Sequence, residues 1–171
     1  VKFDEFFTGW RHEELDPLLF DELKQGRFIN NVFEELYPNQ FVRVTNSGNG
    51  EEAITLRYNK DHNKLYRLNS YREGDIFGIS PRNFEQEMAL DLLMDDDLKL
   101  VSLSGKAGTG KTLLAMAAGL SKVVDEEKYK RLVVSRPISP LGKDLGYLPG
   151  SKAEKFNPWM QPIYDNMEII L

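Results

Sequence analysis

A chain of 171 residues is long enough for one medium-sized domain or two small ones, and its 41% hydrophobic and 29% charged residues are typical of a soluble globular protein. It has no cysteine, which excludes a disulfide framework and thiolate metal sites and fits a reducing, cytoplasmic setting. The net charge of −5 excludes general attraction to nucleic acid, so any such site must be a local patch. No apolar run approaches the ~20 residues that cross a bilayer.

Residues 1–79 are predicted to form a small α+β module that begins with a strand or an extended arm. A helix is expected to start at Asp16-Pro17, because an aspartate caps a helix well and proline suits its first turn. Gly26 ends this first helical segment. A second apolar set at helical spacing extends the helical prediction to residue 37: Phe28, Val32, Phe33 and Leu36.

Residues 41–79 are predicted to form an antiparallel β-meander, because alternating apolar and polar residues are separated by turn sequences. The expected strands are 41–44, 53–58, 64–68 and 76–79. Compact β modules of this kind often bind nucleic acid, and the candidates here are Tyr58, Tyr66, Arg57 and Arg67. Interleaved aromatic and basic residues are scarce, however, which favours a structural module with solvated charges.

The second part of the chain, residues 80–171, is predicted to begin with a helix over 83–94, capped by Asn83. Gln86 lies in its first turn, and an amide side chain can both donate to and accept from the edge of an adenine. An exposed helical glutamine is the alternative interpretation. The acidic run Asp95–Asp97 is expected to be a solvated turn rather than a metal site.

The residues from Gly105 to Thr112 match the phosphate-binding P-loop pattern, with four residues between Gly105 and Gly110-Lys111-Thr112. A buried parallel strand at 101–103 and a helix at 113–124 are predicted on either side. Lys111 is expected to reach the β- and γ-phosphates of ATP and Thr112 to ligate Mg²⁺, so these two are the candidate catalytic residues. The residues predicted to bind nucleotide are Gln86, Gly105, Lys106, Ala107, Gly108, Thr109, Gly110, Lys111, Thr112 and Leu113.

A second buried strand is predicted at 132–135, followed by a long Gly- and Pro-rich loop over 138–151. Arg136 lies at the end of that strand, where α/β sheets place ligand contacts, and Lys143 makes the loop locally basic. Residues 152–171 are predicted to be a helix interrupted at Asn157-Pro158.

Four sequence blocks together resemble the PhoH-like ATPase family, in the branch where a PIN nuclease domain precedes the PhoH domain. They are Gly78–Gln86 (GISPRNFEQ), Ser104–Thr112 (SGKAGTGKT), Ser135-Arg136-Pro137, and Leu145–Gly150 (LGYLPG) followed by Lys155 and Pro158. They span about residues 78–165, and the likeness is weaker over 1–77. The fold class expected from this resemblance is α/β, the start of a P-loop parallel sheet similar to superfamily-1 helicase motors.

The resemblance implies an ATP-binding segment of an RNA-dependent, helicase-like ATPase, in which Gln86 reads adenine and Arg136 lies near the nucleotide or the bound strand. Arg136 and Lys143 are therefore the candidates for contact with a nucleic acid. Single-stranded RNA is the implied partner, and homo-oligomerisation stays open. Two departures limit this interpretation. The PIN domain is absent, so no nuclease carboxylates are claimed, and both ends read as cut, before the Walker B acidic pair, so poor hydrolysis is expected.

Two other functions remain open at this stage. A small-molecule kinase would share the P-loop pattern, but such phosphotransferases usually need an arginine-rich lid, which is not evident here. A non-catalytic interaction module would use the β-meander at 41–79 as its working surface. Free phosphate as the product would indicate the motor, whereas a phosphorylated metabolite would indicate the kinase. A folded chain that binds no nucleotide would indicate the interaction module.

Overall fold

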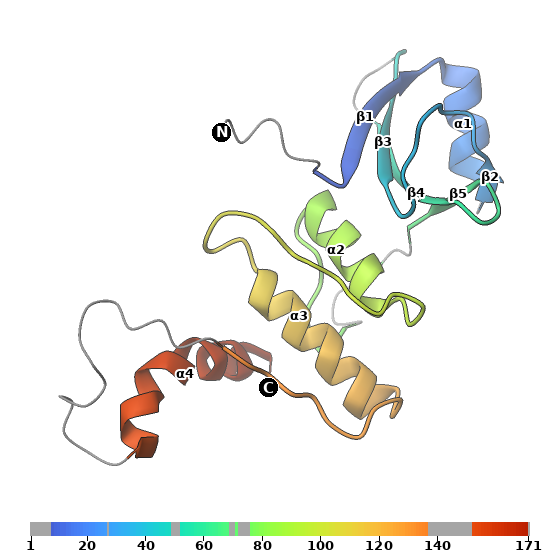
Figure 1. The fold of residues 1–171 in the computed structure, drawn as a ribbon. Helices are drawn as coiled ribbons and strands as arrows, with labels where there is room; N and C mark the ends of the chain where they lie inside the picture. The colour runs from blue at the N-terminus through green and yellow to red at the C-terminus, as the bar shows by residue number, and fades with distance from the viewer. Residues whose placement is uncertain are drawn as a thin grey trace. The chain divides into compact units, whose positions relative to one another are not determined.

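The computed structural model describes residues 8–26, 28–48, 52–68, 71, 76–136 and 152–170, and the chain divides into two compact units, Val1–Ser70 and Tyr71–Leu171 (Figure 1). Each unit has its own buried core. No helix among the described residues is long and apolar enough to cross a membrane.

The described part of the first unit is a five-stranded sheet with one helix. Its strands are β1 (Trp10–Leu15), β2 (Phe28–Asn30), β3 (Phe41–Asn46), β4 (Ala53–Asn59) and β5 (Lys64–Arg67), arranged in the order β1-β3-β4-β5-β2. The antiparallel meander β3-β4-β5 is confirmed. The edge strand β1 lies parallel to β3, and β2 pairs antiparallel with β5 at the other edge.

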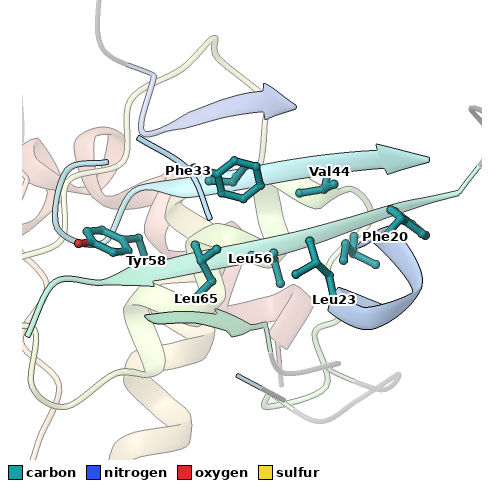
Figure 2. Close-up of a cluster of buried hydrophobic side chains, with 9 residues drawn as sticks. Phe20, Leu23, Phe33, Val44, Leu56, Tyr58 and Leu65 are labelled. Carbon is teal, nitrogen blue, oxygen red and sulfur yellow. The ribbon is translucent and has the colours of Figure 1, made fainter. Parts of the chain in front are cut away.

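Helix α1 (Pro17–Gln25) begins where the sequence predicts, because the Asp16 side chain accepts from the N–H groups of Leu18 and Leu19 at 3.1 and 3.2 Å. Its buried residues Phe20 and Leu23 pack against the sheet (Figure 2). Alternation along the strands supplies most of the other core residues, and Phe33 comes from the segment after β2. The other members are Phe33, Val42, Val44, Ile54, Leu56, Tyr58 and Leu65.

The helix predicted from Phe28 to residue 37 is wrong. Phe28–Asn30 is strand β2, whose pairing with β5 satisfies its backbone groups. The Asn31 side chain then binds the backbone of Phe33 twice, accepting from its N–H at 3.0 Å and donating to its carbonyl at 2.7 Å. Such local side-chain bonds compete with helix formation. The turn delivers Phe33 into the sheet core, so the apolar spacing reflected core contacts rather than a helix face.

The fourth strand predicted at 76–79 is also wrong. Ile76 and Ile79 form an isolated bridge around a turn, in which Phe77 and Gly78 have φ values of 47° and 77°. Positive φ at both central positions makes a tight reversal that a continuing strand does not contain. Ile76 is 1% exposed and belongs to the core of the second unit.

The second unit is built on helices α2 (Phe84–Met94), α3 (Lys111–Leu120) and α4 (Lys152–Ile170). Helix α2 starts as predicted, because the Asn83 side chain accepts from the N–H of Gln86 at 2.9 Å. Helix α3 contacts both α2 and α4, and its small buried residues Ala117 and Ala118 allow that close packing. It passes into a π-helical turn over Ser121–Asp125. Helix α4 continues through Asn157-Pro158, and Figure 1 shows it bent rather than interrupted.

The parallel sheet predicted for this unit does not form among the described residues, since neither 101–103 nor 132–135 is a strand. A strand needs a neighbour for its backbone N–H and C=O groups, and the residues described here pair with neither segment. Val133, within the second segment, is accordingly 74% exposed, and Leu100, just before the first, is 89% exposed. Leu132 nevertheless lies against α3, where a Cβ added at Gly119 would approach its Cδ1 to 2.7 Å.

Candidate nucleotide-binding site

The loop before α3 is curled by glycines that adopt left-handed backbone conformations. Gly108 has φ +78° and Gly110 has φ +85°, values at which any other L-residue is strained. No atom lies within 4 Å of a Cβ built on Gly108, whereas one built on Gly110 would lie 3.1 Å from Gln86 Nε2. The curl of the loop therefore depends on both glycines, and the approach of α2 depends on Gly110.

Gly110 also serves as the N-cap of α3, and it has no side chain to occupy the helix end. The first helical bond of the turn runs from the N–H of Leu114 to the carbonyl of Gly110 at 2.9 Å. The N–H groups of the preceding residues point out of the helix end toward the loop, where the helix dipole is positive. A ten-residue helix with a glycine loop at its N-terminus is an anion-binding arrangement.

Lys111 reaches back across the loop. Its ammonium nitrogen Nζ donates to the carbonyls of Gly105 at 2.9 Å and Lys106 at 2.6 Å, and to Thr109 Oγ1 at 3.3 Å. Thr109 Oγ1 in turn donates to the carbonyl of Lys106 at 2.9 Å. The cation therefore lies among the loop's own carbonyls, within reach of any anion that the loop N–H groups bind.

Gln86 connects the start of α2 to the loop. Its Oε1 accepts from the N–H of Arg82 at 2.8 Å, and its Nε2 donates to the carbonyl of Thr109 at 3.3 Å. The side chain is therefore held beside the phosphate-binding loop with both ends of its amide engaged. Its proposed contact with adenine stays a prediction.

The remaining predicted residues differ in their surroundings. Lys106, Ala107 and Thr112 are exposed around the start of α3, while Leu113 is half-buried against the core. Arg136 is exposed at the end of the described segment 76–136, and Lys143 lies outside the described residues. The structure thus brings together Gln86 and residues 105–113, and it leaves the role of Arg136 a prediction.

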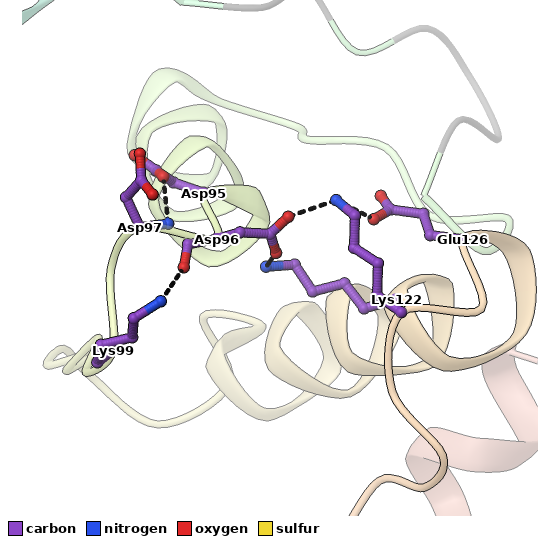
Figure 3. Close-up of polar contacts among 7 residues, drawn as sticks. Asp95, Asp96, Asp97, Lys99, Lys122 and Glu126 are labelled. Atoms are coloured by element: carbon purple, nitrogen blue, oxygen red, sulfur yellow. Dashed lines mark hydrogen bonds and ion pairs between the residues drawn. The ribbon is translucent and has the colours of Figure 1, made fainter.

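Sequence reasoning missed an ion-pair cluster at the opposite end of α2 (Figure 3). Asp96 Oδ1 lies 2.7 Å from the ammonium of Lys122, its Oδ2 pairs with Lys128, and Lys128 also lies 2.8 Å from Glu126 Oε2. Lys99 donates to the Asp96 carbonyl at 2.7 Å. The acidic run forms the predicted turn, and Asp96, whose side chain is 39% exposed, is also paired with two lysines.

The bonds from Lys122 and Lys128 lower the pKa of Asp96 from 3.8 to about 2, and the Asp96 and Glu126 carboxylates raise the pKa of Lys128. Lys122 is buried, so its charge requires such a partner. These contacts join positions 26 and 32 residues apart, a distance at which charge spacing along the sequence gives no signal. No group of three or more histidines and acidic residues suited to a metal occurs in the described part of the chain.

Residues 78–171 match the family model described as PhoH-like protein. The chain belongs to the PhoH-like family. This match includes the P-loop, Gln86 and α2, so the site described above lies within the family's domain. PhoH-like proteins are generally ATP-binding, which agrees with the anion-binding arrangement at the start of α3.

Similar proteins extend this family likeness over almost the whole chain. "Protein PhoH2" of Bacillus subtilis is 46% identical over 170 residues, which are 98% of this chain and 38% of the relative. "Protein PhoH2" of Mycolicibacterium smegmatis is 50% identical over 95 residues, 55% of this chain and 22% of the relative. A "PhoH-like protein" of Synechocystis is 32% identical over 115 residues, 66% of this chain and 34% of the relative. No solved structure matches.

The chain therefore spans well under half the length of these PhoH-like relatives. The first unit, with its sheet, falls outside the residues matched by the family model but inside the alignment with the Bacillus subtilis protein. Both units thus have a counterpart in at least one PhoH2 protein.

Proposed function

We propose that this chain is the ATP-binding segment of a nucleic-acid-dependent ATPase that acts on RNA. The observation that carries the proposal is the loop at the start of α3, where left-handed glycines, a helix N-terminus without a side-chain cap and the Lys111 ammonium converge. Each of these features favours a bound phosphate. Membership of the PhoH-like family supports ATP as the nucleotide.

The residues divide the work by their chemistry. The N–H groups at the start of α3 bind phosphate oxygens, and Lys111 exchanges its loop carbonyls for those oxygens, since an ammonium bonds more strongly to an anion than to a neutral carbonyl. The Thr112 hydroxyl is exposed beside it and suits Mg²⁺, a hard cation that prefers oxygen ligands. The bonds of Gln86 to Arg82 and Thr109 hold it beside the loop, which supports its proposed contact with the adenine.

Hydrolysis needs two further groups, one that orients the attacking water and an acidic contact to the metal. We assign neither role within these 171 residues. The proposal is therefore nucleotide binding with inefficient turnover by this chain, and RNA-stimulated ATPase activity for a protein of the relatives' full length.

The first test measures binding of a fluorescent ATP analogue with Mg²⁺ by titration. Lys111→Ala is expected to weaken binding at least tenfold, because it removes the ammonium that lies among the loop carbonyls. Lys130→Ala is the matched control: it removes an exposed lysine of the same unit and is expected to leave affinity unchanged. Equal affinity of the Lys111→Ala variant and the unaltered chain would contradict ATP binding at this loop.

The second test concerns the nucleic acid. If the two ligands are coupled, single-stranded RNA must change ATP affinity by the same factor by which ATP changes RNA affinity. Titrating each ligand with and without the other checks this reciprocity. Analysis of the reaction products distinguishes the ATPase from the kinase alternative, because a phosphorylated small molecule instead of free phosphate would indicate a kinase.

A further inference from the structure

The face of the first unit's sheet that lies opposite its core is lined by basic and aromatic residues. Successive residues of a strand point to opposite faces, and the buried Val42, Leu56 and Leu65 mark the core face, which α1 covers. On the other face, which we call the basic face, lie Trp10, His12, Glu14, Phe41, Arg43, Thr45, Ala53, Thr55, Arg57, Asn59, Lys64 and Tyr66. Glu14, in the edge strand β1, is the acidic member of this set, against the three basic residues Arg43, Arg57 and Lys64.

One row of this face crosses four strands. Trp10 pairs with Phe41, Phe41 with Arg57, and Arg57 with Tyr66. Phe41 is only 3% exposed, so it is not available to a ligand. Trp10, Arg57 and Tyr66 are half-buried and are partly accessible to solvent. A guanidinium thus stands between aromatic side chains on neighbouring strands, at the spacing where cross-strand residues interact.

Arg57 is held in a defined orientation. Its Nε and Nη2 both donate to Asn39 Oδ1, at 3.2 and 2.7 Å. Arg43, in the next row, donates to Thr55 Oγ1 at 3.3 Å. Because these side chains are already ordered, a ligand that contacts them loses less conformational entropy on binding.

The charge of the three central strands is one-sided. Strands β3, β4 and β5 contain four basic residues and no acidic one, in a chain with a net charge of −5. Three of the four, Arg43, Arg57 and Lys64, lie on the basic face. Arg67 lies on the opposite face, where it donates to the carbonyl of Lys24 in α1 at 2.7 Å.

We propose that the basic face binds single-stranded nucleic acid, with Arg43, Arg57 and Lys64 contacting phosphates and Tyr66 stacking on a base. Positive charge accounts for the attraction to phosphate, and aromatic rings account for a strand whose bases are unpaired, since a duplex hides the base faces. This inference deepens the proposed function by naming a second site, apart from the P-loop, that holds the nucleic acid.

The register of the sheet changes which residues of this module are candidates for contact with a nucleic acid. Of the four residues first considered, Tyr58 is buried in the core and Arg67 lies on the other face. Arg57 and Tyr66 are instead direct cross-strand neighbours, and Arg43 and Lys64 join them from adjacent strands. Basic and aromatic residues that are scattered along the sequence are therefore gathered by the register of the sheet.

Fluorescence anisotropy with a 5′-labelled 12-nucleotide oligouridylate and the complete 171-residue chain tests the proposal. Arg57→Ala and Tyr66→Ala are each expected to weaken binding about tenfold. Arg57→Ala should also reduce the slope of log K against log[salt] by roughly 0.7, while Tyr66→Ala leaves it unchanged, because only the arginine displaces counterions. Tyr66→Phe keeps the ring and should retain affinity, which separates stacking from misfolding.

Arg67→Ala is the matched control, since it removes a charge from the same strand on the opposite face. Its affinity should equal that of the unaltered chain, and a loss as large as that of Arg57→Ala would overturn the proposal. Equal binding of a duplex, with no effect of Tyr66→Ala, would indicate a general polyanion surface and also overturn it. ATP titrations on the same samples keep the two hypotheses apart: an oligonucleotide that fails to bind a chain that binds ATP refutes this inference alone.

Discussion

At the scale of single residues, the conformation of the P-loop is stabilised by hydrogen bonds from the Lys111 ammonium. Lys111 bonds to two loop carbonyls and to Thr109, and Gln86 bonds to the Thr109 carbonyl from the side of α2. The loop is thus positioned by one residue from within and one from outside. Gly110 lies next to Gln86, and a Cβ at this position would come within 3.1 Å of Gln86 Nε2.

Alanine at Gly110 should therefore be more damaging than alanine at Gly108. Both changes impose a side chain on a left-handed backbone, at about 1–2 kcal/mol. Only Gly110→Ala also displaces the Gln86 amide, 3.1 Å from the new Cβ, and so weakens its bond to Thr109, worth about 0.5–1.5 kcal/mol. Nucleotide titration and thermal denaturation measure both effects. Repeating the pair in a Gln86→Ala background should abolish the difference, and a difference that persists would contradict this account.

At the scale of elements, α2 is fastened at both ends to the segment that carries the P-loop. Gln86 at its N-terminal end contacts the loop, and Asp96, just beyond its C-terminal end, pairs with Lys122 in the π-helical turn that follows α3. Lys128 adds a second cation to the same carboxylate. The ion pairs join α2 to the turn after the C-terminal end of α3, and the loop at the N-terminal end of α3 is the proposed phosphate site.

The Asp96 cluster should make stability depend on pH in acid. The pKa of Asp96 is lowered to about 2 in the folded chain from an ordinary value of 3.8, so its stabilising contribution is present above about pH 4 and is lost as the pH falls through about 2. Asp96→Asn is expected to lower the melting temperature at pH 6, and the difference from the unaltered chain should shrink between about pH 4 and 2. Asp97→Asn, a change in the neighbouring exposed carboxylate, is the control. A pH-independent difference would show that Asp96 acts through something other than its charge.

How far the sequence predicts an element depends on where that element's bonds are made. Caps and glycine loops are local, so Asn83 and the P-loop are found from the sequence, as is the meander with its short turns. The segment 28–36 has apolar residues at helical spacing, a pattern that predicts a helix. In the structure Phe28 belongs to strand β2 and Phe33 packs in the sheet core. The expected strand at 132–135 is apolar enough, but pairing depends on distant neighbours that a local pattern does not contain.

Within the candidate site, the sequence predicts the anion-binding residues and misses what holds them. Spacing alone identifies Lys111, since the motif is contiguous. The contact between Gln86 and Thr109 spans 23 residues, and that between Asp96 and Lys128 spans 32. Contacts at such separations follow from packing of α2 on α3, which requires the fold itself.

At the scale of the whole molecule, the chain has two cores that share no residue among those described. One core lies between α1 and the sheet, and the other joins α3 to residues of α2 and α4. The proposed functions divide along the same line, with phosphate bound in Tyr71–Leu171 and nucleic acid in Val1–Ser70. Damage to one core should then leave the chemistry of the other unit intact.

Leu56→Ala tests this division. Leu56 is 1% exposed in the sheet core, and truncating such a residue costs about 2–5 kcal/mol. We expect the first unit to melt at lower temperature, the oligonucleotide to bind more weakly, and the ATP analogue to bind with unchanged affinity. Leu90→Ala, at a residue with 0% exposure in the other core, should give the reverse pattern and serves as the matched control. Calorimetry measures the melting temperatures, and titration measures the affinities for the two ligands. If Leu56→Ala weakened the binding of both ligands equally, the two units would unfold as one cooperative unit. Nucleotide binding would then alter the stability of the basic face as well.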